Sequence, residues 1–455
     1  MTEGNDQVRQ SPLAGPADAL EPAAGEAMMT LIRRLYPICR SITGNGVRQS
    51  LDIIQELIPL RRHEIPTGTR IFDWEIPREW NIRDAGIRDM SGRRLVAFQN
   101  HTLHVLNYSV PVRKRISREE LRGHLFTLPD HPDWIPYRTS YYKEDWGFCL
   151  AHNQLSRLTD AFYDIEIDSS LAHGSLTLAE CVIPGQTEEE VLLSAHLCHP
   201  SLCNDNLSGL AVQAYLLRWL ASEPRRYTYR AVFAPGTIGS LAWLWLNRKR
   251  LHAVRAGLVL TGVGDRGGFT YKRSRRGDAM IDRIVVRALQ DEAGPSTVRD
   301  FSPYGYDERQ YCSPGFDLPM GRLSRTPFGE YPEYHTSADD PDFVSAGQLQ
   351  GALALCQRVV RYLEHNRIWR NLSPYGEPQL GKRGLYGAVG GAGGPDQQRM
   401  AMLWLLNLAD GTRSLLDIAD RAEIAMDVLM DAAERLERVG LLKNQSVQGS
   451  GLNVE

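Results

Sequence analysis

Two residues with metal-binding side chains lie close together in the middle of this chain. His196 ends an apolar segment, residues 191–195, that is typical of a buried strand, and Asp205 follows a short loop at the start of an expected helix. Open α/β sheets place their ligands at the carboxyl ends of the strands. His335 occurs in a polar loop before another expected helix. Imidazole and carboxylate are ordinary zinc ligands, so His196, Asp205 and His335 predict a catalytic site for one zinc ion with a fourth position open for water.

Each of these residues also has an interpretation without catalysis. An isolated histidine at a strand end is usually a hydrogen-bonded core residue, and an aspartate before a helix is often its N-cap. Asp205 together with two histidines favours the metal site over both interpretations. A closed structural zinc site is a further alternative, but its adjacent Cys and His lack the spacing of paired zinc knuckles. Its ligands would be His196, Cys198, His199 and Cys203.

Hydrolysis at a zinc site also needs a base that accepts a proton near neutral pH. We predict that Glu308 is this base, because its loop is expected at the active cleft; the other candidate carboxylates are Asp307, Glu330 and Glu333. A salt bridge to Arg309 is the alternative role for Glu308.

Further side chains are expected to face the substrate. Tyr334 or Tyr331 would donate a hydrogen bond to an oxyanion, with packing at the rim of the cleft as the alternative. His199 would contact the substrate or support the metal ligands, and Arg138 would bind an anionic group of the substrate. Glu330 is included in the same substrate-facing group.

Strands and helices alternate around these residues. Strands are expected at residues 175–182, 190–196, 229–234 and 257–261, and helices at residues 206–220, 238–249, 280–291 and 344–365. This alternation predicts a largely parallel sheet in a three-layer α/β domain. Helical periodicity also marks residues 25–59. Residues 71–148 are instead rich in Trp, Tyr, Pro and β-branched residues, with one helix expected at 117–126, which indicates an inserted β-rich module.

These changes along the chain predict the domain boundaries. Residues 1–24, rich in Ala, Pro, Gly and acidic residues, form a disordered tail. Residues 25–66 plus 165–370 form the α/β domain, and residues 67–164 form the inserted β-rich domain. Residues 371–396 are a Gly/Pro-rich linker. Residues 397–455 contain three amphipathic helices followed by a strand, which is the order of a winged-helix domain.

Composition excludes several classes of function. The chain has 455 residues and a net charge of −3, so no global field attracts nucleic acid or an anionic membrane. It has no apolar run of about 20 residues and no signal-peptide pattern. Seven scattered cysteines suit a reducing compartment. We therefore expect a cytoplasmic protein with a small-molecule or short peptide substrate and no membrane partner; a homo-oligomer remains open.

A winged helix suggests DNA binding, but the charges of the expected recognition helix argue against it. Acidic residues there outnumber basic ones, whereas a DNA reader needs Lys and Arg to meet the phosphates. We expect protein contacts or intramolecular packing instead. The acidic residues are Glu423, Asp427, Asp431, Glu434 and Glu437, and the basic ones are Arg435 and Arg438.

Long motifs in the chain are similar to those of a known family. The chain resembles the two-zinc aminopeptidases, and more closely a bacterial family of aminopeptidase-like proteins linked to polysaccharide biosynthesis, with an inserted β module and a C-terminal winged helix. The resemblance implies a zinc-exopeptidase (phosphorylase/hydrolase-like) fold. It covers most of the chain and includes residues 135–142, 146–149, 196–200, 204–209, 235–240, 307–315 and 329–337.

The resemblance also shows where this chain departs from the two-zinc pattern. His196, Asp205 and His335 match the first histidine, the bridging aspartate and the last histidine. The aspartate two residues after the first histidine is replaced by Cys198, and the Glu-Glu pair that supplies the base and a ligand falls on Gly236 and Thr237.

The pattern has one further aspartate ligand. In this chain the carboxylate nearest to its position is Asp265, which we include among the substrate-facing residues. Together these departures predict one zinc ion and a base in a new position. The expected activity is zinc-dependent hydrolysis of an amide or peptide bond in polysaccharide or secondary-metabolite biosynthesis. The alternatives are one-zinc acyl transfer, as in glutaminyl cyclases, and a non-catalytic ligand-binding scaffold.

Overall fold

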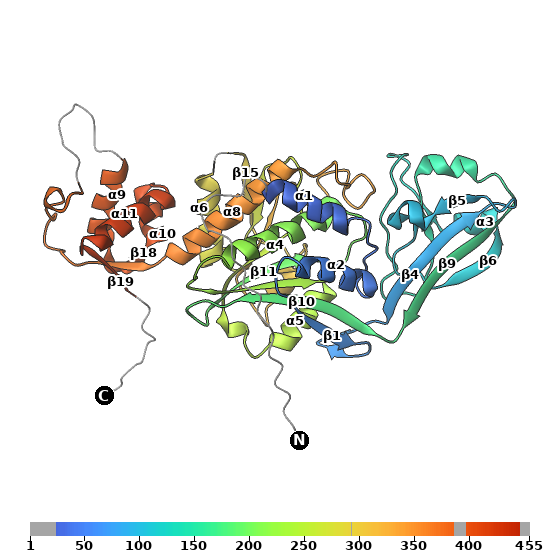
Figure 1. Cartoon of the computed structure of the whole chain (residues 1–455), viewed down its shortest axis with the longest axis horizontal. Coiled ribbons are helices and arrows are strands. Elements are labelled where there is room, and N and C mark those ends of the chain that lie inside the picture. Colours follow the sequence, from blue (N-terminus) through green and yellow to red (C-terminus); the bar gives the residue numbers. More distant parts are fainter. Residues whose placement is uncertain (1–23, 293, 386–396, 446–455) are drawn as a thin grey trace, which may run out of the picture. The chain divides into compact units, whose positions relative to one another are not determined.

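The structure, a computed structural model, describes residues 24–292, 294–385 and 397–445. Its main element is an eight-stranded mixed sheet with the order β1-β10-β12-β11-β13-β16-β14-β15 (Figure 1). The four central strands, β12, β11, β13 and β16, are parallel to one another. The sheet consists of β1 (Arg61–Pro66), β10 (Ser175–Ile183), β11 (Glu190–His196), β12 (Thr228–Ala234), β13 (Val254–Leu260), β14 (Phe269–Lys272), β15 (Ser296–Arg299) and β16 (Met320–Ser324).

Helices cover both faces of this sheet. Every residue of β11 is buried, as expected for a central parallel strand with apolar side chains on both faces. Helix α4 lies on one face with α1 against it, and α5 lies on the other (Figure 1). The predicted three-layer α/β architecture is therefore present. The helices of this part are α1 (Ala24–Leu35), α2 (Asn45–Gln55), α4 (Gly209–Leu220), α5 (Ile238–Asn247) and α7 (Glu308–Tyr311); α8 (Ala346–His365) begins here.

The β-rich module lies between two strands that pair with each other. Strand β1 pairs antiparallel with β10, and residues 67–174 between them form most of the module. Strand β9 crosses the predicted boundary at residues 164/165. The expected helix at 117–126 is wrong in length, because the chain leaves α3 to pair β7 with β8. The elements are β2 (Arg70–Ile71), β3 (Trp74–Glu75), β4 (Glu79–Arg88), β5 (Arg94–Ala97), β6 (Val112–Ser117), α3 (Arg118–Arg122), β7 (Leu125–Phe126), β8 (Phe148–Cys149) and β9 (Phe162–Ala172).

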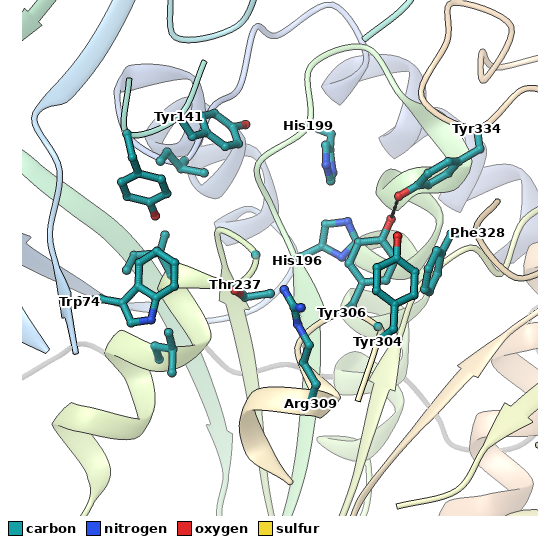
Figure 2. Close-up of a pocket in the computed structure, with 16 residues that line it drawn as sticks. Trp74, Tyr141, His196, His199, Thr237, Tyr304, Tyr306, Arg309, Phe328 and Tyr334 are labelled. Atoms are coloured by element: carbon teal, nitrogen blue, oxygen red, sulfur yellow. Dashed lines mark hydrogen bonds between the residues drawn. The ribbon is translucent and has the colours of Figure 1, made fainter. Parts of the chain in front are cut away.

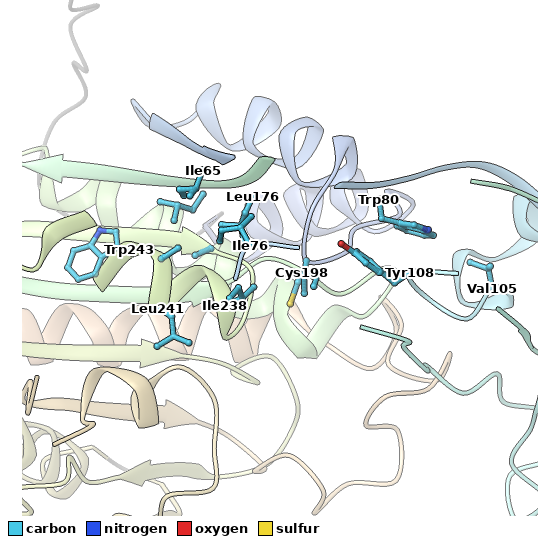
Figure 3. Packing of buried hydrophobic residues seen from close by; sticks show 14 of the residues in the cluster. Ile65, Ile76, Trp80, Val105, Tyr108, Leu176, Cys198, Ile238, Leu241 and Trp243 are labelled. Atoms are coloured by element: carbon cyan, nitrogen blue, oxygen red, sulfur yellow. The ribbon is translucent and has the colours of Figure 1, made fainter. Parts of the chain in front are cut away.

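The module shares one hydrophobic core with the sheet. Trp80 and Tyr108 from the module belong to the same buried cluster as Leu176 and Trp243 (Figure 3). Trp80 also donates a hydrogen bond from its indole to the carbonyl of Ser109 at 2.8 Å, which satisfies its polar atom in the core. The module is therefore anchored to the α/β domain by packing as well as by its two connections.

A second compact unit comprises Met280–Pro295 and Leu355–Glu455. Strand β17 lies between β18 and β19 in a small sheet, with α9, α10 and α11 in the winged-helix order. Because β17 belongs to this sheet, the winged helix begins before the predicted boundary at 397. The elements are α6 (Met280–Gln290), β17 (Ile368–Asn371), α9 (Gln397–Leu408), β18 (Asp410–Ser414), α10 (Leu415–Ala422), α11 (Met426–Arg438) and β19 (Leu442–Gln445).

Parts of the predicted domains lie outside the described residues. These are the tail up to residue 23, residues 386–396 of the linker and the last ten residues of the chain. In the part that the structure describes, no helix has the length and apolar character needed to cross a membrane. The cytoplasmic location stays a prediction.

Candidate functional site

Asp205 lies at the centre of the site, and two of the predicted ligands contact it. His196 Nε2 lies 2.9 Å from Asp205 Oδ1, and His335 Nε2 lies 3.0 Å from Oδ2. The hydroxyl of Tyr306 donates to Oδ2 at 2.8 Å and lies 2.8 Å from the hydroxyl of Tyr334. Because the single Tyr306 proton points to Asp205, Tyr334 is the donor in that second bond. The fold thus brings His335 to His196 and Asp205, although it lies 130 residues beyond Asp205 in the sequence.

His199 is a further metal-binding side chain at this point. Ligand atoms of His196, His199 and Asp205 all lie within 4.8 Å of one another. Two imidazoles and a carboxylate suit zinc, and Nδ1 of His196 is buried without a partner. Among the described residues, neither Cys198 nor Cys203 joins such a group, so the closed structural site is not assembled.

The environment sets the protonation states that a metal requires. Burial alone would raise the pKa of Asp205, but interaction with His199 and hydrogen bonds from His196 and His335 hold it well below the ordinary value. Burial lowers the pKa of His199 to about 3, which the charge of Asp205 only partly offsets. The carboxylate is therefore ionised and His199 is neutral at pH 7, as metal ligation demands.

The loop of His335 is positioned by the inserted module. His335 has a φ of 58°, a left-handed conformation that non-glycine residues rarely adopt. Its carbonyl accepts from the backbone N–H of Tyr137 at 2.8 Å, and Ser337 exchanges hydrogen bonds with Ile135. The Tyr137 ring also meets both His199 and His335 edge-on, with centroids 5.2 and 5.0 Å away. The module therefore supports the ligand without carrying one.

Two buried polar side chains, those of Arg40 and Asp339, hold the other ligand loops. Arg40 donates from Nε to the carbonyl of His199 at 2.9 Å, and Asp339 accepts the backbone N–H of Asp205 at 3.0 Å. Burial raises the pKa of Asp339 to about 8. Sequence reasoning missed Arg40, Asp339 and Tyr306, because none lies in a periodic segment or in a pattern of metal ligands.

Glu308, the predicted base, is held in an ion pair. Lys272 Nζ lies 2.9 Å from its Oε1, both side chains are buried, and the backbone N–H of Tyr306 donates to Oε2 at 3.0 Å. The geometry therefore gives Glu308 the role of anchoring the loop of Tyr306.

Asp307 lies next to the space left by the missing Glu-Glu pair. A Cβ added to Gly236 would lie 3.2 Å from Cβ of His196 and 3.5 Å from Oδ1 of Asp307. Oδ1 accepts from Ser240 at 3.0 Å, whereas Oδ2 is buried without a partner. Burial raises the pKa of Asp307 to about 6, and interaction with His196 only partly opposes this. An unpartnered carboxylate with this pKa is suited to accept a proton near neutral pH.

Three predicted substrate-facing residues are engaged elsewhere or lie at the surface. Asp265 accepts from Thr326 Oγ1 at 2.7 Å and from Asn204 Nδ2 at 3.0 Å, which gives it a structural role. Glu330 is exposed and paired with Arg299. Arg138 is also exposed.

A cavity of 320 Å³ opens beside the ligand cluster (Figure 2). His196, His199 and Tyr334 line it, and the last two are among the residues expected to face a substrate. Gly236 and Thr237 form part of its wall, so the positions of the missing Glu-Glu pair face the same space. The cavity is large enough for a small organic substrate.

Two family models match the chain. One is described as a domain of unknown function (DUF4910) and matches residues 29–366, and the other is a winged helix-turn-helix model that matches residues 367–444. A protein of Clostridium acetobutylicum, named for polysaccharide biosynthesis and an aminopeptidase-like domain, is 47% identical over 419 residues. The match covers 92% of this chain and 96% of the relative.

Solved structures show the same fold. One from Clostridium acetobutylicum, described as a peptidase, has a TM-score of 0.89 at 46% identity and covers 93% of this chain and 98% of its own. A zinc aminopeptidase from Bacillus subtilis has a TM-score of 0.55 at 13% identity and covers 76% and 96%. At 13% identity the likeness concerns the fold alone. The predicted fold class, a zinc-exopeptidase domain with a C-terminal winged helix, is confirmed.

Proposed function

The chain belongs to the family of aminopeptidase-like proteins with a C-terminal winged helix, and on that basis we propose that it is a zinc-dependent amide hydrolase. The observation that carries the proposal is the convergence of His196, His335 and His199 on one ionised, buried Asp205. The name of the Clostridium acetobutylicum relative supports a role in polysaccharide biosynthesis.

One zinc ion would be held by His196, Asp205 and His335, with His199 as a further donor. When bound, zinc supplies Lewis-acid chemistry to an amide carbonyl and to water. The carboxylate neutralises part of the charge of the ion, and the neutral imidazoles leave their nitrogen lone pairs free.

Asp307 is the base in this proposal. Water adds its oxygen to the acyl carbon while Asp307 accepts one of its protons, and the C–N bond then breaks as Asp307 returns that proton to the leaving nitrogen. The free Oδ2 of Asp307 and its position beside Gly236 support this role. Glu308 stays a sequence prediction, and its ion pair with Lys272 disfavours it.

Zinc content and amide turnover test the proposal together. The wild-type chain should retain about one zinc ion after gel filtration, and His196→Ala and His335→Ala should each lose it or bind it at least ~10-fold more weakly. Asp307→Asn should keep zinc but lower kcat by a factor of about 10² or more. Arg255→Gln, an exposed change on β13, is the control.

Each outcome has a defined meaning. A wild-type chain that stays metal-free after zinc loading contradicts the proposal. Zinc binding without turnover of any amide in a broad library favours the non-catalytic scaffold. Full activity of Asp307→Asn removes Asp307 as the base but leaves the zinc site standing.

A further inference from the structure

The charge of the cavity wall limits which substrates the site can accept. An enzyme that removes N-terminal residues must accept a substrate ammonium group, for which carboxylates are the natural partners. Among the described residues that line the cavity, none is an aspartate or a glutamate. Asp205, the buried carboxylate that His196 and Tyr306 of the wall contact, already accepts from both of them and from His335. The described wall of the cavity therefore offers no free carboxylate to an ammonium group, since Asp307, whose Oδ2 is unpartnered, is fully buried and does not line it.

Arg309 is the cation of the same wall. It lies on α7, and its side chain points into the cavity between Thr237 and Tyr304 (Figure 2). In the part of the chain that the structure covers, the Arg309 side chain has no hydrogen-bond or ion-pair partner, and its Nε is buried. A guanidinium group with unused donors in a half-buried position is a strong site for a carboxylate.

The neighbours of Arg309 do not neutralise it. Oδ1 of Asp307 accepts a hydrogen bond from Ser240 at 3.0 Å. Oε1 of Glu308 forms an ion pair with Nζ of Lys272 at 2.9 Å. Asp307 and Arg309 do interact electrostatically, since Arg309 opposes the rise in the pKa of Asp307 that burial causes. The side chains of Asp307, Glu308 and Arg309 thus point to different partners. Of the three, only Arg309 lines the cavity.

Exposed aromatic rings form the rim of the cavity. Trp74 and Tyr142 of the inserted module are 45% and 53% exposed, with ring centroids 5.4 Å apart, and Tyr304 is 74% exposed. Large rings that remain exposed together mark binding sites for ligands with apolar faces. The rim therefore suits a substrate that contains a ring.

We propose that the cavity binds N-acylated, ring-containing substrates through a carboxylate held by Arg309, and that it does not select a free N-terminal amine. This inference rests on the proposed amide hydrolysis at the same site. It names the substrate class: N-acyl amino acids with a ring, or N-acylated acidic sugars, which share the amide, the ring and the carboxylate.

A charge series with a constant ring tests the inference. The probes are N-acetylphenylalanine, which is anionic, its neutral amide N-acetylphenylalaninamide, and cationic phenylalaninamide. N-acetylneuraminic acid and neutral N-acetylglucosamine form the sugar arm. Calorimetric binding to zinc-loaded chain should favour the anion in at least one arm, and the arm that binds identifies the source of the carboxylate.

Variants of Arg309 assign the preference to one side chain. Arg309→Gln should weaken binding of the anionic probe about 10- to 100-fold, and should change binding of the neutral probe less than about twofold. Arg309→Lys should restore part of the affinity, since it keeps the charge but loses the planar fork. Arg255→Gln should change neither value, and thermal unfolding checks that each variant is folded.

Three results would overturn the inference: equal anion affinity in wild type and Arg309→Gln, a preference for phenylalaninamide, or no binding of either anionic probe at millimolar concentration. Turnover distinguishes this failure from failure of the proposed function. Hydrolysis of the anionic, neutral and cationic probes at equal rates would contradict the carboxylate site at Arg309 and support the proposed hydrolase. Arg309-dependent binding without hydrolysis would support the carboxylate site and contradict the proposed hydrolase.

Discussion

A buried carboxylate without a full set of partners destabilises the protein that contains it, and Asp307 is such a group. Carboxylates with perturbed pKa values cluster at functional sites, so the unpaired Oδ2 of Asp307 is a more informative feature than another ion pair would be. Glu308, one residue later, has the opposite character, since Lys272 pairs with it in the core. We therefore expect neutral substitutions of these two adjacent carboxylates to change the stability of the protein in opposite directions.

Asp307→Asn should stabilise the zinc-free chain. The folded-state pKa of about 6 lies above the ordinary value of 3.8 for an aspartate, so ionisation of Asp307 costs stability as the pH rises from about 4 to about 6, and the full cost remains at higher pH. The variant should therefore gain up to about 3 kcal/mol in the free energy of unfolding at pH 7.5 and clearly less at pH 5. Urea unfolding in chelator at both pH values measures the difference.

Glu308→Gln is the matched control for this prediction. It leaves buried Lys272 without its counter-charge and should lose roughly 3 kcal/mol under the same conditions. A stability gain in Asp307→Asn that is equal at both pH values, or a loss at pH 7.5, would contradict the assigned environment of Asp307.

At the scale of elements, the segment of the inserted module around Tyr137 supports the metal ligands without contacting an ion. Its backbone pairs with the loop of His335, and its ring packs against His199 and His335. Tyr137→Ala should weaken zinc binding about 10-fold, as loss of outer-shell support generally does. Tyr137→Phe keeps the ring and should bind zinc as the wild type does. Competition with a zinc indicator measures both, and equal affinity in all three chains would refute the supporting role.

The elements also explain how much of the site the sequence predicts. His196 and Asp205 follow from a strand–loop–helix pattern whose periods are visible, and β11 and α4 match the expected segments closely. His335 was identified by its polar loop and by resemblance. Tyr306 and Arg309 lie in a loop and a short helix whose direction depends on the buried pair of Lys272 and Glu308, and such a tertiary contact has no period to reveal it.

At the scale of the whole molecule, the chain joins an aminopeptidase-like fold to a winged helix. The presumed recognition helix α11 keeps its acidic character in the structure, and one of its arginines, Arg435, is paired with Asp431 at 2.9 Å. We expect the full chain to bind mixed-sequence duplex DNA no more tightly than about 10⁻⁴ M at physiological salt. A gel-shift series over salt concentration measures this. A tight complex that weakens steeply with salt would show that the acidic helix is not the surface that meets DNA.

The pairing of β1 with β10 has a consequence for the order of events during synthesis. Strand β1 leaves the ribosome before residues 67–174, and its partner β10 follows only after them. At about 5–20 residues per second this delay is on the order of ten seconds, far longer than local folding of a small β module needs. The module can then fold first and hold β1 and β10, the strands on either side of it, close to each other. In the nascent chain, the part that later supports His335 would thus be finished before the sheet that carries His196 has begun to close.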